Sequence, residues 1–432
     1  MSVFLDFQLP SQATWFYWSL ILVVTLFFQF VRWWSLRNLD LLALYLLVPG
    51  MLLVQAGHTN PAASGMRFSG YIALLSASAF WLLRSLFDGL LTRRPTYRAN
   101  INAAGMVWLG FALFAAMTVA TLRKPAVPTE SIGKTPVAIT SVKEGATAVV
   151  AQTQSLDTAD ATIWVERGFS LLAHFAVAAG LFTIGRRHFK DRDLGVAMAT
   201  LYLLVPYTGY HFAQLHHVLP AALVVWAVAC YRNPWWTGAL LGLAAGATFF
   251  PVLLFPVWLR LYWKRSAWRF VAGYFAALLV GVGITILVLW SAGLFPVGFT
   301  KALHLSDWQP WKMPSAEGFW QGVHWAYRLP VFILYAGFVL TLFVWPPVRT
   351  MADAVAYSAA LLIGVQFWYA ERGGMYVLWY LPLLILMTLR PTAADLEPLP
   401  SNGPGRTTRW LRSTWSRVRK SPNETNPPAL AG

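Results

Sequence analysis

The sequence contains few charged residues, since Asp, Glu, Lys and Arg make up only 12% of its 432 residues. An average soluble protein has roughly 25%, and so few charges cannot cover the surface of a water-soluble chain of this length. A single cysteine, Cys230, excludes an intrachain disulfide. The stretch before Gln12 holds Asp6 and no Lys or Arg, which is the wrong charge for a cleaved signal peptide and predicts a first apolar segment that is retained.

Apolar residues dominate instead, with a hydrophobic content of 57% and a mean hydropathy of +0.54. Apolar runs near the length that crosses a bilayer recur along the whole chain, and helices satisfy their backbone groups internally in lipid. We therefore predict an all-α polytopic membrane protein with about eleven transmembrane helices. The predicted spans are Ala13–Val31, Leu39–Gln55, Ser69–Leu91, Ile101–Leu122, Gly168–Ile184, Leu194–Gly209, Val218–Cys230, Phe270–Leu294, Leu329–Trp345, Ala354–Tyr369 and Tyr376–Leu389.

The basic residues lie in alternate connections between the predicted spans, which is typical of topology signals rather than of nucleic-acid binding, despite a formal net charge of +16. The positive-inside rule places the N-terminus outside the cell membrane and the C-terminus in the cytoplasm. A single crossing between Arg232 and Arg260 would violate that rule. The small residues and prolines of this segment predict a broken helical hairpin that turns near Phe249–Pro251 and returns to the cytoplasmic side.

Composition divides the chain into four parts. Residues 1–122 form a four-span N-terminal membrane block, and residues 123–162 form an extracytoplasmic loop rich in Pro, Thr, Ser and Ala. Residues 163–389 form a larger membrane core. Residues 390–432 form a basic cytoplasmic tail whose Pro, Ser, Arg and Asn predict disorder.

Three acidic residues lie just before the fifth predicted span. Asp157 and Asp160 share one face if this segment is helical, and we expect Glu166 no more than about one turn from Asp160. Two carboxylates on one face can supply a general base or hold a divalent metal ion. The alternative is a solvated loop end without a special role.

Other polar and aromatic residues lie in the predicted outer connections. His216 and His217 can bind metal or phosphate, or form an interfacial polar turn. Trp308 and Trp311 can stack on a sugar, or belong to an aromatic belt at the membrane surface. Arg372 can form a bidentate contact with a lipid phosphate, or pair with its neighbour Glu371.

Within the predicted spans, Arg84 and Asp88 are spaced for an internal ion pair, with Arg84 extending toward the interface. Gly238, Gly242 and Gly246 recur every four residues and predict a smooth face on which another helix packs closely. No other predicted span carries a carboxylate or lysine at mid-depth, which is evidence against a proton- or sodium-coupled transporter.

From about Ile163 to Leu389 the chain resembles the GT-C superfamily of membrane glycosyltransferases. The resemblance rests on the sequence at 184–193, the Leu-Tyr-Leu-Leu-Val-Pro-Tyr segment at 201–207, the Gly-spaced hairpin at 236–251 and the Leu-Trp-Tyr-Leu-Pro-Leu-Leu segment at 378–384. It implies transfer of a hexose or pentose from a polyprenyl-phosphate donor to an acceptor on the non-cytoplasmic face. The family's catalytic carboxylates usually follow the first span, but the connection at 58–68 has none here.

By that resemblance, the catalytic role falls to Asp157, Asp160 and Glu166, and a phosphate-binding role falls to Arg372. The expected partners are the lipid bilayer and the lipid-linked sugar. The alternative hypothesis is a non-catalytic multi-span membrane protein or a translocase of lipid-linked substrates.

Overall fold

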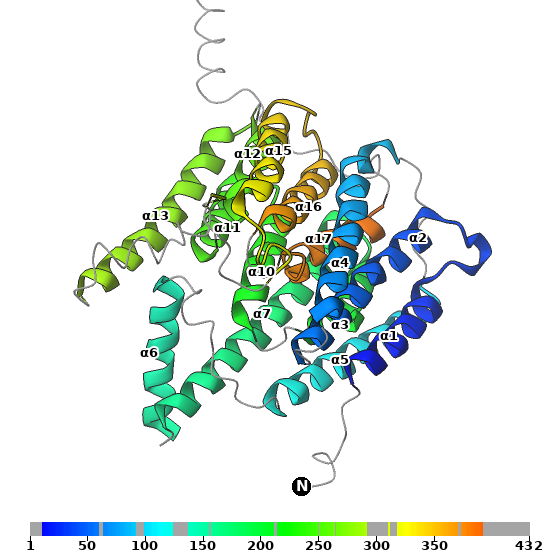
Figure 1. Cartoon of the computed structure of the whole chain (residues 1–432), viewed down its shortest axis with the longest axis horizontal. Coiled ribbons are helices and arrows are strands. Elements are labelled where there is room, and N and C mark those ends of the chain that lie inside the picture. The colour runs from blue at the N-terminus through cyan, green and yellow to red at the C-terminus, as the bar shows by residue number, and fades with distance from the viewer. Residues whose placement is uncertain are drawn as a thin grey trace, which may run out of the picture.

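The computed structural model describes residues 11–59, 64–91, 99–123, 137–154, 157–210, 214–248, 250–263, 265–291, 310–311, 318–369 and 373–391. In this part of the chain every regular element is a helix, as predicted (Figure 1). The α-helices are α1 (Gln12–Phe27), α2 (Leu36–Ala43), α3 (Leu47–Thr59), α4 (Ser64–Leu86), α5 (Ala103–Arg123), α6 (Val137–Gln154), α7 (Thr158–His188), α8 (Arg192–Leu204), α9 (Pro206–Tyr210), α10 (Leu215–Ala229), α11 (Pro234–Ala247), α12 (Phe255–Tyr262), α13 (Ala267–Ser291), α15 (Trp325–Val344), α16 (Met351–Trp368) and α17 (Leu381–Leu389). The 3₁₀ segments are η1 (Phe30–Arg32), η2 (Leu44–Leu46), η4 (Asp88–Leu90), η6 (Phe250–Leu254) and η7 (Val377–Trp379).

Each predicted span coincides with helical structure, but the helices differ in length. Among the described residues, 7 helices are long and apolar enough to cross a membrane: Leu36–Gly57, Gly65–Leu86, Ala103–Arg123, Thr158–His188, Ala267–Ser291, Trp325–Val344 and Met351–Trp368. The first of these joins α2, η2 and α3. The other predicted spans are shorter helices, so the number of about eleven, taken from bilayer-length apolar runs, is not confirmed.

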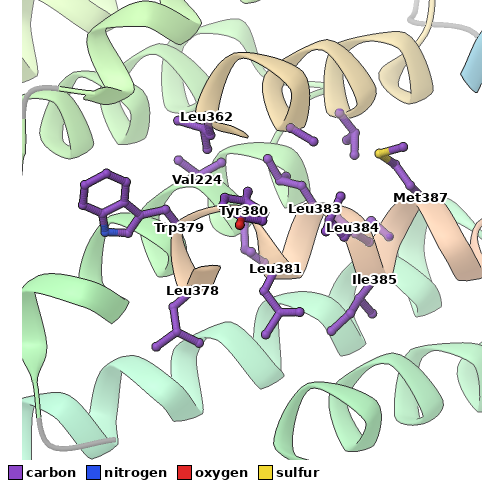
Figure 2. Close-up of a cluster of buried hydrophobic side chains, with 14 of the residues drawn as sticks. Val224, Leu362, Leu378, Trp379, Tyr380, Leu381, Leu383, Leu384, Ile385 and Met387 are labelled. Carbon is purple, nitrogen blue, oxygen red and sulfur yellow. The ribbon is translucent and has the colours of Figure 1, made fainter. Parts of the chain in front are cut away.

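Helix α17 lies at the centre of the fold. It is hydrophobic on every side, and all its residues from Leu381 to Leu389 are buried. It contacts α2, α7, α8, α10 and α16. Figure 2 shows Leu383 and Leu384 of this helix among side chains from its neighbours, such as Val224 and Leu362. A helix that is apolar all round is stable only in such a buried position.

The predicted interruption of the hairpin segment is present. Helix α11 ends at Ala247 because Thr248 is extended, and η6 and α12 follow. The Tyr262 hydroxyl at the end of α12 donates to the Tyr231 carbonyl at 2.5 Å and lies 3.3 Å from Thr237 Oγ1 in the first turn of α11. The end of α12 therefore returns to the place where α11 begins.

Two of the three spaced glycines form the predicted close face. A Cβ added at Gly238 would lie 2.1 Å from the Phe270 carbonyl oxygen of α13, and one at Gly242 would lie 2.2 Å from that of Tyr274. A Cβ at Gly246 would meet nothing within 4 Å. The close packing of α11 on α13 therefore depends on Gly238 and Gly242, and the prediction is wrong for Gly246.

A buried network of charges joins the N-terminal block to the end of α17. The Arg84 guanidinium donates to both Asp40 carboxylate oxygens, at 2.8 and 2.7 Å, and to Asp88 at 2.8 Å. Arg390 pairs with the second oxygen of Asp88. The predicted Arg84–Asp88 pair is confirmed, but Arg84 is only 8% exposed because Asp40 holds it inside, so it does not extend to the interface.

Helix ends gather in two regions of the molecule, which are named below by their residues. At one end, which we name the basic end, α12 finishes beside the starts of α11 and α13, and Arg260 near the end of α12 donates to the last carbonyls of α15. Five exposed tryptophans lie within a few residues of these helix ends in the sequence: Trp235, Trp236, Trp263, Trp268 and Trp345. At the other end, named the Glu166 end, α7 and α10 begin side by side.

Candidate functional site

The first acidic residue of the predicted trio serves as a helix cap. Asp157 precedes α7, and its carboxylate accepts a hydrogen bond from the Thr158 amide at 2.7 Å. An acidic residue at this position satisfies a free N–H group and interacts favourably with the helix dipole. Asp160 lies in the first turn of the same helix, and both residues are exposed. The helix start thus explains Asp157 without catalysis.

Glu166 has a different environment, because its side chain is buried between α7 and its neighbours. Its Oε1 accepts a hydrogen bond at 3.0 Å from the amide of Leu215, the first residue of α10. Its Oε2 forms an ion pair with Lys143 of α6. The side chains of Glu166 and Lys143 are only 11% and 12% exposed. One carboxylate therefore links three helices at the Glu166 end.

The three carboxylates are not brought together. Glu166 follows Asp160 by six residues, which is about 9 Å along the helix axis and roughly 240° around it. The expectation that they lie within one turn is wrong, because α7 is already regular from Thr158 onward. Among the described residues, no three His, Cys, Asp or Glu side chains are grouped as metal ligands. The divalent metal ion stays a prediction.

His216 and His217 lie in the first turn of α10. They follow Leu215, whose amide donates the hydrogen bond to Glu166. His217 is buried, and its ring stacks on Tyr376 with centroids 5.2 Å apart. His216 is half-buried, with its ring centroid 4.3 Å from that of His217. The stack continues from Tyr376 to Trp379 at 4.1 Å. The histidines are therefore more than a polar turn, since one of them packs into the interior.

The ring stack reaches the interruption of the hairpin. Trp379 of η7 stacks on Phe250 of η6, with centroids 3.6 Å apart. The Gln366 side-chain oxygen of α16 accepts from the amides of Gly374 at 2.7 Å and Tyr376 at 3.3 Å, which fixes the segment before η7. These buried rings pack against the start of α10 through His217.

Three predicted site residues remain. Trp311 is 58% exposed, and Trp308 and Arg372 lie outside the described residues. A buried arginine near the start of α15 has no counterpart among the predictions: Arg328 is 2% exposed and donates to the Pro310 carbonyl at 2.9 and 3.3 Å.

Sequence reasoning also missed Lys143 and Gln366 as parts of the cluster. Lys143 is separated by 23 residues from its partner Glu166 and lies on α6, whereas the sequence predicts a loop for residues 123–162. Gln366 is a polar residue in an apolar run, and that contrast is the signal that could have identified it.

The Glu166 end thus combines a nearly buried ion pair with the packed starts of α7 and α10 and a stack of buried rings. The carboxylate contacts the Lys143 ammonium and accepts a hydrogen bond from the N–H group of the first residue of α10. Such a carboxylate can accept a proton, and the adjacent ammonium can neutralise an anion. Comparison with family models, with curated proteins and with solved structures found no match to the chain.

Proposed function

We propose that the protein is a multi-span membrane glycosyltransferase that moves a sugar from a polyprenyl-phosphate donor to an acceptor hydroxyl on the non-cytoplasmic face. The observation that carries this proposal is the buried Glu166–Lys143 pair at the start of α7 and α10. Ionisable groups within apolar helices are costly and are retained mainly at functional sites. Among the described residues, the other buried acids, Asp40 and Asp88, pair with arginines at the far end of α4.

Placement in a membrane is supported by the apolar helices and by the exposed aromatic residues. The seven long apolar helices have the length that a bilayer requires. Exposed tryptophans follow the helix ends at the basic end, and Trp164, Trp290 and Tyr327 are exposed near helix ends on the opposite side. Trp and Tyr are enriched at both interfaces of membrane proteins. The positive-inside rule then assigns the basic end to the cytoplasm and the Glu166 end to the outside.

In the proposed reaction, the acceptor hydroxyl attacks the anomeric carbon of the donor sugar. The bond between that carbon and the phosphate oxygen breaks, and the polyprenyl phosphate leaves as an anion. Glu166 accepts the proton of the hydroxyl, and Lys143 stabilises the charge of the leaving phosphate. We therefore move the base assignment from Asp160 to Glu166, because Asp160 is exposed and six residues away on another face of α7.

The test uses the full-length protein purified into sealed proteoliposomes with a polyprenyl phosphate that carries a labelled sugar. A panel of hexose and pentose donors is supplied with a lipid or peptide extract as acceptor. We expect label to pass into a non-donor product only in the presence of the protein. Flipping of the donor without any transfer of label would contradict the proposal and favour a translocase.

A further inference from the structure

A groove opens at the basic end of the molecule, between the end of α12 and the end of α15. Its volume is about 670 Å³. Apolar residues contribute most of its surface, and its charged lining consists of Arg260, Arg265 and Arg349. No acidic side chain lines it among the described residues. The groove is therefore amphipathic, with positive charge beside an apolar wall.

The three arginines differ in what they already bind. Arg260 donates to the Phe343 carbonyl at 2.8 Å and to the Val344 carbonyl, so it caps the C-terminus of α15. Arg349 uses its backbone amide, not its side chain, to donate to Asp353 at 3.0 Å. In the described part of the chain, no hydrogen bond or ion pair engages the guanidinium group of Arg265 or Arg349. Two guanidinium groups are therefore available to a ligand.

Exposed tryptophans place the groove at the depth of lipid headgroups. Trp263 lines it and is 64% exposed, and Trp345, adjacent to the lining residue Val344, is 67% exposed. Indole rings prefer the boundary between hydrocarbon and headgroups, where one edge is apolar and the other is wet. Guanidinium groups at that depth match the geometry of phosphate oxygens.

We propose that this groove binds the headgroup of an anionic phospholipid from the leaflet at the basic end. Arg265 and Arg349 donate to the phosphate oxygens, and Trp263 and the apolar wall contact the glycerol and the upper acyl chain. A lipid is favoured over free phosphate because the apolar lining would remain uncovered by an inorganic ion. This proposal rests on the membrane placement in the proposed function, but it does not require sugar transfer.

The test measures lipid binding to the purified full-length protein in a neutral detergent. Native mass spectrometry and thermal stabilisation are followed while dioctanoyl phosphatidylglycerol, dioctanoyl phosphatidylcholine or inorganic phosphate is added. The groove variant is Arg265→Gln with Arg349→Gln, and Arg260 is left intact because it caps α15. The control variant is Arg232→Gln with Arg269→Gln, which removes the same charge from exposed positions outside the groove.

We expect phosphatidylglycerol to bind more tightly than phosphatidylcholine. The groove variant should lose about fivefold in affinity for each arginine, or about 25-fold in total, while the control variant stays near wild type. Equal losses in the groove and control variants would overturn the site, as would equal binding of the two lipids. Binding of inorganic phosphate without competition by the lipid would overturn the choice of ligand. Sugar transfer is measured in a separate assay, so the lipid-binding results can be interpreted even if no transfer is detected.

Discussion

Replacement of Gly242 by alanine tests the packing of the broken hairpin. The added Cβ would lie 2.2 Å from the Tyr274 carbonyl oxygen, whereas ordinary contacts begin at 3.4 Å. Because the obstacle is backbone of α13, α11 and α13 must separate by about 1 Å, and overpacking of this kind costs about 3 kcal/mol. Alanine recovers about 1 kcal/mol through its higher helix propensity. The expected net loss of stability is about 2 kcal/mol.

Gly246→Ala is the matched control on the same helix, because its Cβ would meet nothing within 4 Å. Thermal unfolding of both variants in the same detergent, followed by intrinsic tryptophan fluorescence, measures the difference. We expect a lower melting temperature for Gly242→Ala and an unchanged or slightly higher one for Gly246→Ala. Equal melting temperatures for the two variants would refute the close packing of α11 on α13.

Three further predictions concern charge and topology. Asp40→Asn should destabilise the protein by about 3–5 kcal/mol, because it leaves the buried Arg84 short of its bidentate partner; a detergent melt within about 1 kcal/mol of wild type would contradict this. Asp157→Ala should cost about 1 kcal/mol and Asp157→Asn almost nothing, since asparagine caps a helix equally well; equal losses in a melting comparison would show that the carboxylate has another role. Reporter fusions after Arg265 should report cytoplasm and fusions near Asp157 should report the outside; two signals from the same side would remove the assigned topology.

The positions of the helices could be predicted from the sequence better than their lengths. Apolar runs locate α4, α5, α15 and α16 because those helices are both continuous and apolar. They do not show that α17 is a short helix with its axis in the protein interior, since a buried helix and a spanning helix are equally hydrophobic. Four predicted spans are therefore shorter in the structure than a bilayer requires.

The residues of the candidate site could be predicted from the sequence better than their contacts. Glu166 was among the predicted carboxylates, but its contacts come from Lys143, 23 residues earlier, and Leu215, 49 residues later. A single sequence contains no signal for such distant contacts. Spacing alone also could not separate Asp157, which caps a helix, from a carboxylate that is buried and paired. The Arg84–Asp88 pair was predictable because both residues lie on one helical face, whereas Asp40 was not.

The most direct test of the account is the rate of sugar transfer in a pair of isosteric variants. Glu166→Gln keeps the shape of the side chain but removes the charge that accepts the proton, and Asp160→Asn makes the same change at an exposed position of the same helix. In proteoliposomes with the labelled polyprenyl-phosphate sugar, we expect Glu166→Gln to lose about 10²–10⁴-fold in turnover. Asp160→Asn should transfer at the wild-type rate, and both variants should melt cooperatively. Full turnover in Glu166→Gln, or its loss in Asp160→Asn alone, would contradict the assignment of Glu166 as the catalytic carboxylate.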